Sequence, residues 1–77
     1  MKKYDEYFEK ERILYVVAVI SGDKAEAKLH MGRMQGFQDA LCIMGVDFTK
    51  ICYFNDRIKT AIHFAYRMKS RYSKQNN

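Results

Sequence analysis

The sequence has no proline and no tryptophan, and only four glycines and two cysteines among its 77 residues. Charged residues are interspersed with aromatic ones, and without proline the chain lacks the composition of a disordered segment. A single pair of cysteines is too few for the disulfide framework of a small secreted protein. Cys42 and Cys52 both fall at apolar positions of helical spacing. We therefore expect two buried, reduced thiols.

Long hydrophobic runs are also missing. The longest, residues 13–20, is too short to span a bilayer as a helix. The twelve residues before it carry four basic and four acidic side chains, whereas a secretion signal begins with a net positive charge. The sequence thus predicts a cytoplasmic protein that does not engage a membrane.

No group of residues has the spacing of a catalytic, cofactor or metal site. Glu26 and His30 stand one helical turn apart, but no further ligand has a fitting position. His30 also lies on an apolar stripe, which favours a packed, hydrogen-bonded imidazole. His63 has Lys59 and Arg67 one turn away on either side, and such cationic neighbours disfavour metal binding. We therefore expect a protein that is not an enzyme and that holds no cofactor or metal.

Two helices are expected in the first half of the chain. Residues 3–20 read as one helix, although the β-branched residues of 13–20 also fit a strand. A strand would need a partner, and two lone strands do not form a stable sheet. The central helix begins near Lys24, because Asp23 and Glu26 have the spacing of a capping pair. It ends before Gly45, whose position fits a left-handed cap.

The central helix carries glycines that need a reason. An interior helical glycine costs about 1 kcal/mol relative to alanine. Gly32, Gly36 and Ala40 recur at every fourth position, which places them on one stripe where another helix can approach the backbone. The sequence thus predicts a helix-packing seam, crossed by the valines and isoleucines of the first helix. On this basis Gly36→Leu would destabilise the fold.

The clearest periodicity lies in the last third of the chain and predicts a long helix. Its apolar residues step by three and four over three heptads. We expect this association stripe to meet a second copy, and it consists of Ile51, Phe54, Ile58, Ala61, Ala65, Met68 and Tyr72. A break at Asn55-Asp56, giving a short helix and a longer one, is an alternative.

The positive charge of the chain is confined to its end. Residues 50–77 hold seven basic residues against one acidic residue, whereas residues 1–49 carry a net charge of −1. A basic face therefore runs beside the association stripe, and its predicted binding residues are Lys50, Tyr53, Arg57, Phe64, Arg67, Arg71 and Lys74. Such a face can bind phosphates or the acidic surface of a protein.

These patterns predict an all-α protein with a helical hairpin and a long last helix, spanning residues 1–73, and a disordered polar tail at 74–77. A domain this small is marginally stable alone, so we expect a homo-oligomer, with a dimer favoured. The first function predicted is a regulatory or inhibitory contact with an acidic protein. Nucleic acid is the alternative, and acidic small ligands such as nucleotides are the third. In its size and its lysine, tyrosine and asparagine content the chain resembles accessory proteins of bacterial mobile elements.

Overall fold

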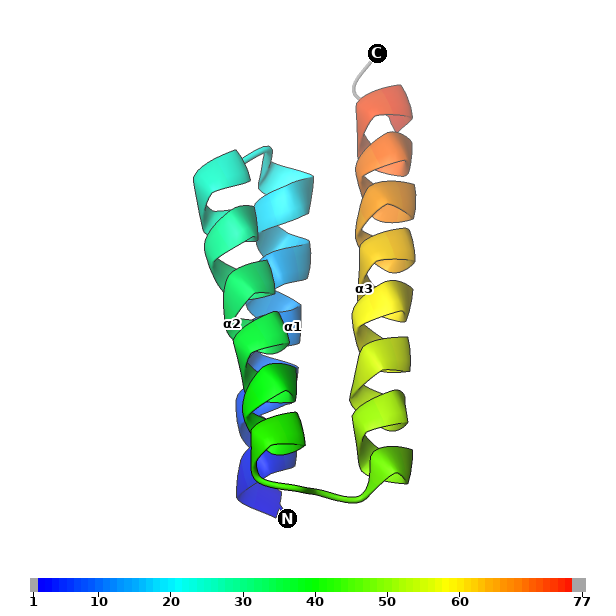
Figure 1. The fold of residues 1–77 in the computed structure, drawn as a ribbon. Helices are drawn as coiled ribbons and strands as arrows, with labels where there is room; N and C mark the ends of the chain where they lie inside the picture. Colours follow the sequence, from blue (N-terminus) through cyan, green and yellow to red (C-terminus); the bar gives the residue numbers. More distant parts are fainter. Residues whose placement is uncertain (1, 76–77) are drawn as a thin grey trace.

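A computed structural model describes residues 2–75 of the chain, and the surroundings of the side chains from residue 5 to residue 72. It contains three helices, α1 (Lys2–Ser21), α2 (Lys24–Ile43) and α3 (Phe48–Gln75). Helices α1 and α2 form an antiparallel hairpin, and α3 runs back beside it, parallel to α1 (Figure 1). The predicted all-α fold is confirmed. Within the described residues, no helix is both long enough and apolar enough to cross a membrane.

Residues 13–20 are helical, as the sequence favoured. Val16 and Val19 are buried in the core, whereas Val17 between them is 54% exposed. A strand would place residues 17 and 19 on the same face, so this burial pattern follows the helical period. The uninterrupted helix from Lys2 carries these β-branched residues because α2 and α3 both pack against its apolar side.

The central helix is capped at Asp23 and Gly45 as expected, but the carboxylate of Glu26 contacts His30 and does not complete the capping pair. The carboxylate of Asp23 accepts a hydrogen bond from the backbone N–H of Glu26 at 3.1 Å. At the other end Gly45 adopts a φ of 74°, a left-handed conformation that glycine enters without steric cost. The N–H of Gly45 donates to the carbonyl of Cys42, and that of Val46 donates to the carbonyl of Leu41, which closes the helix.

Helix α3 is continuous from Phe48 to Gln75, so it has no break at Asn55-Asp56. Its start is fixed by Asp47, whose carboxylate accepts a hydrogen bond from the N–H of Thr49 at 3.2 Å. The helix extends two residues into the expected polar tail. The last two residues of that segment, at 76 and 77, lie outside the described part of the chain.

The core is a single apolar cluster to which all three helices contribute. Its centre is aromatic, since the ring of Phe8 lies 4.8 Å from that of Phe54 and 5.9 Å from that of Phe37. The rings of Phe37 and Phe54 are 5.1 Å apart and nearly perpendicular. The cluster's buried members are Phe8, Tyr15, Val16, Val19, Met34, Leu41, Phe54, Ile58, Ala61 and Ala65.

This core corrects the role expected for the association stripe. Phe54 is 2% exposed, and Ile58, Ala61 and Ala65 are also buried within the single chain. These four residues of the stripe pack against α1 and α2 within the chain, whereas Tyr72 at the end of the stripe is 52% exposed. A heptad pattern specifies that one face of a helix is buried, and it does not distinguish an internal partner from an external one.

The predicted seam is corrected as well. A Cβ atom added to Gly32 or Gly36 would meet nothing within 4 Å, and Ala40 is exposed. Helix α1 packs instead against the other stripe of α2, which includes His30 and Met34. The prediction that α1 crosses the glycines is therefore wrong, and with it the reason to expect Gly36→Leu to destabilise the single chain.

The cysteines also differ from expectation. Cys42 and Cys52 are both free thiols, as predicted, but both are exposed rather than buried. Both lie near the α2–α3 connection, and Cys52 falls on the exposed stripe of α3, one and two turns before Asp56 and Lys59. Apolar spacing alone did not place them, because the core covers only part of the apolar surface at this end of the bundle.

Candidate functional site

A buried ionic cluster joins α1 to α2. Glu11 is 3% exposed and His30 is 7% exposed. Nδ1 of His30 lies 2.5 Å from a carboxylate oxygen of Glu11, and its Nε2 lies 3.1 Å from Glu26. Arg33 donates to the other oxygen of Glu11 at 3.3 Å. His30 is thus packed and hydrogen-bonded, as the sequence predicted, and the cluster holds the hairpin together.

The cluster does not have the arrangement of a metal site. Among the described residues, no three or more histidine, cysteine, aspartate or glutamate side chains are grouped so that they could hold an ion. Both nitrogens of His30 face carboxylate oxygens within the chain. The ring therefore has no free nitrogen for a ligand.

The predicted basic face of α3 lies on the surface. Tyr53 is 52% exposed and Phe64 is 47% exposed, while Lys50, Arg67 and Arg71 are exposed. Arg57 is only partly exposed. The side chain of Lys74 belongs to the part of α3 whose side chains are not described.

The lower part of this face is occupied by contacts within the chain. Arg57 donates to Glu9, which also accepts a hydrogen bond from Arg12. The guanidinium of Arg57 lies 5.7 Å from the centre of the Tyr53 ring, a cation–π distance. A shallow pocket of about 190 Å³ lies here, lined by Arg12, Tyr53, Asp56, Arg57 and Thr60. With Glu9 and Asp56 present, this part of the face is close to electrically balanced.

The upper part of the face is different. The Glu9–Arg57 pair sets the register between the parallel helices α1 and α3, and its partners are 48 residues apart. By this register Phe64 lies at the level of residues 13–17 of α1, where Ile13 is 53% exposed and Val17 is 54% exposed. Arg67 and Arg71 follow on the next two turns of α3.

We group the exposed residues of this level as the α1–α3 face, and they are Ile13, Val17, Phe64, Arg67 and Arg71. Within the described side chains, neither arginine has an ion pair. Sequence reasoning found the residues from α3 and missed Ile13 and Val17. Their spacing of four residues was a usable signal, but it was hidden in a run where every residue is apolar.

A second apolar surface lies on the outer side of α2. Leu29 is 44% exposed and Ile43 is 87% exposed, with Gly32, Gly36 and Ala40 exposed between them. We call these five residues the outer α2 stripe. At its lower end Met44 and Phe48 are 64% and 76% exposed. The glycines therefore make this surface flat, with large apolar side chains at both ends.

The chain was compared with family models, with curated proteins and with solved structures, and none of them matches.

Proposed function

We propose that the protein is a non-enzymatic binding module that regulates or inhibits another protein. The observation that carries this proposal is the α1–α3 face, which combines exposed aliphatic and aromatic side chains with two arginines that have no intramolecular ion pair among the described side chains. Aromatic residues and arginine are the residue types enriched in the energetically important centres of protein interfaces. The partner expected is a protein surface that combines apolar and acidic groups.

The charge distribution favours a protein over a nucleic acid. Affinity for duplex DNA comes mainly from cations that neutralise phosphates. On the basic face, Arg57 is engaged by Glu9, and Asp56 lies in the same pocket lining. The apolar side chains of Ile13 and Val17 would find no apolar surface to pack against on a phosphate backbone. Nucleic acid is therefore the alternative function, and acidic small ligands are considered below.

Reversing two charges tests the proposal. The parent protein is used to capture its partner from an extract of the native host, and the captured partner is identified by mass spectrometry. We expect Arg67→Glu/Arg71→Glu to abolish this capture. With the partner identified, the variant should mainly slow association, by about tenfold or more, because charges at an interface steer the encounter. Both side chains are exposed, so the helicity measured by circular dichroism should be unchanged.

The matched control is Lys28→Glu/Lys59→Glu, which reverses two exposed lysines on α2 and α3 and changes the net charge equally. This control should keep the partner. If both double variants lose it equally, the α1–α3 face is not the binding surface. Duplex DNA bound more tightly than about micromolar at about 150 mM salt, and released by the arginine reversals alone, would assign the face to nucleic acid instead.

We also propose that the protein forms a homodimer through the outer α2 stripe. A chain of 77 residues buries too little surface to be more than marginally stable. The stripe offers a flat surface where two α2 helices could approach closely, flanked by Leu29 and Ile43. A second copy would cover the glycines, whose helical cost α1 and α3 do not offset.

Gly36→Leu distinguishes the effect of this stripe on the stability of the single chain from its effect on dimer formation. In the single chain we expect an increase in the free energy of unfolding of about 1 kcal/mol, because leucine is the better helix former and nothing lies within 4 Å. In sedimentation equilibrium the same substitution should shift the protein from dimer to monomer. If the parent is a monomer at high micromolar concentration, the dimer proposal fails. A variant that melts lower when dilute would instead show a contact that the single-chain fold does not contain.

A further inference from the structure

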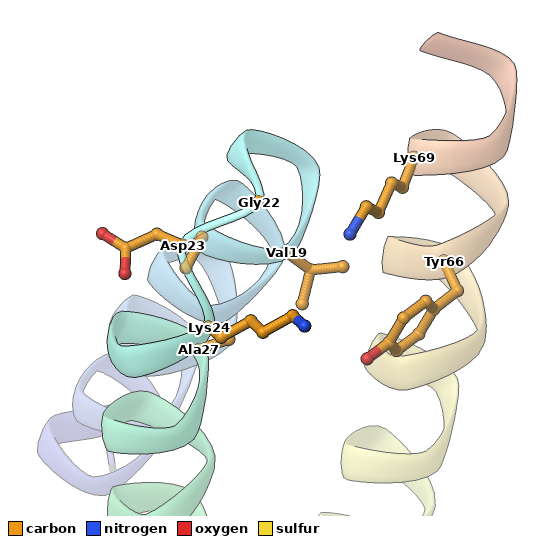
Figure 2. A pocket seen from close by; sticks show the side chains of 8 residues that line it. Val19, Gly22, Asp23, Lys24, Ala27, Tyr66 and Lys69 are labelled. Carbon is orange, nitrogen blue, oxygen red and sulfur yellow. The ribbon is translucent and has the colours of Figure 1, made fainter. Parts of the chain in front are cut away.

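A cavity of about 220 Å³ lies at the upper end of the bundle, between the α1–α2 turn and α3. Its walls are apolar where α1 and α2 supply Ala18, Val19 and Ala27. Its rim is polar and carries Lys24 from the start of α2 and Tyr66 and Lys69 from α3. Figure 2 shows these side chains around the space between the hairpin and α3.

The two lysines converge on this cavity from opposite sides. In Figure 2 the ammonium group of Lys24 extends from α2 toward α3, and that of Lys69 extends from α3 toward the hairpin. Neither lysine has an ion pair within the side chains described. Two unpaired cations directed at one space repel each other, and an anion between them would relieve that repulsion.

No carboxylate of the cavity lining offsets this charge. The one acidic residue of the lining is Asp23, whose carboxylate points away from the cavity (Figure 2) and caps α2 through the N–H of Glu26. The positive end of the α2 dipole adds to the same potential, because α2 begins at Lys24.

The phenol of Tyr66 supplies a hydrogen-bonding group and a ring. Its side chain points from α3 toward the hairpin (Figure 2). Tyr66 also lies close enough to Tyr15 to affect it: burial, with a smaller contribution from Tyr66, raises the pKa of the Tyr15 phenol above its usual value. The Tyr66 ring therefore stands at the boundary between the polar rim and the apolar walls.

We propose that this cavity binds the phosphate group of a small phosphate monoester. The ammonium groups of Lys24 and Lys69 hold the phosphate oxygens, since lysine binds phosphate as a point charge, and the Tyr66 hydroxyl donates a hydrogen bond. The body of the ligand lies against Val19, Ala27 and the Tyr66 ring. Ligand pockets for drug-sized molecules span about 300–1,000 Å³, so a cavity of about 220 Å³ admits a phosphate with a compact apolar group.

This site is independent of the α1–α3 face, because it uses none of the residues of that face. It gives the bundle a small-molecule site next to the hairpin turn. A ligand bridging Lys24 and Lys69 would join α2 to α3, the pair of helices with the fewest mutual contacts. Binding should therefore also stabilise the fold through mass action.

The test is a titration of the full chain, labelled with ¹⁵N, with phenyl phosphate followed by two-dimensional NMR. We expect amide shifts concentrated at residues 18–27 and 66–69, and inorganic phosphate should bind there more weakly because it leaves the apolar walls uncovered. Phenol, which has no charge, should not bind. Lys24→Gln/Lys69→Gln should weaken phenyl phosphate binding by about tenfold or more, since two charge-assisted contacts are lost.

Lys10→Gln/Lys59→Gln is the control, because it removes two exposed lysines elsewhere on α1 and α3. It should bind phenyl phosphate as the parent does. Equal weakening by both double variants, or shifts spread over all lysine-bearing surfaces, would show charge attraction without a site and overturn the proposal. Shifts absent from residues 18–27 would overturn it too. Because partner capture depends on Arg67 and Arg71, this result does not depend on the proposed protein partner.

Discussion

Replacing His30 by alanine is expected to lower the free energy of unfolding by about 3 kcal/mol, because it leaves the carboxylate of Glu11 buried without its closest partner. Arg33 contacts the other oxygen of Glu11 at 3.3 Å, so part of the charge stays compensated. A domain of 77 residues has a stability of about 4–12 kcal/mol. The variant should thus lose a large share of its stability in urea unfolding followed by circular dichroism.

His63→Ala is the matched control, since His63 is exposed on α3 and surface changes usually stay within about 0.5 kcal/mol. The double variant Glu11→Leu/His30→Leu removes both buried polar side chains and should recover most of the loss, because replacing both partners with apolar groups of similar size leaves no buried polar group without a partner. A His30→Ala variant as stable as the parent would show that the hairpin does not depend on this pair.

Phe8→Ala is expected to have the largest effect of any single substitution in α1. The ring of Phe8 is 1% exposed and packs against those of Phe37 and Phe54, so all three helices lose contacts at once. Removal of a buried phenylalanine side chain costs about 3–5 kcal/mol. Against the marginal stability of so small a domain, we expect a protein that is substantially unfolded at 37 °C, as measured by its thermal transition.

The control for this prediction is Phe48→Ala, which removes the same side chain from a position that is 76% exposed. It should change the free energy of unfolding by about 0.5 kcal/mol or less. Phe8→Leu keeps most of the buried volume and should lose clearly less than alanine does. Equal losses from Phe8→Ala and Phe48→Ala would contradict the core described here.

The sequence by itself determined that the chain is helical and where α2 begins and ends. Asp23 and Gly45 bound α2 through interactions that reach only three or four residues along the chain, so local chemistry was sufficient to predict them. The buried character of Phe54, Ile58, Ala61 and Ala65 was likewise readable, because helical periodicity places them on one face. The buried, hydrogen-bonded state of His30 was predicted in the same way, from its position on an apolar stripe of α2.

Only the tertiary structure decided which apolar surface meets which partner. Helix α2 has two adjoining apolar stripes, and periodicity alone does not predict which of them is buried. In the structure α1 packs against the stripe of His30 and Met34, and Gly32 and Gly36 remain exposed. Likewise the heptads of α3 could serve a second copy or the hairpin. That choice depends on interactions between residues far apart in sequence, such as Glu9 with Arg57.

The candidate sites divide in the same way. The basic residues of α3 could be placed on one face from their spacing, because a helix fixes the angle between successive side chains. Three features depend on how the three helices pack. Arg57 is bound by Glu9 of α1, Ile13 lies at the level of Phe64, and Lys24 and Lys69 border one cavity. Helical periodicity specifies the direction in which each side chain points from the axis of its own helix. A binding site made by two helices also depends on the distance and angle between their axes, which only the packing of the helices sets.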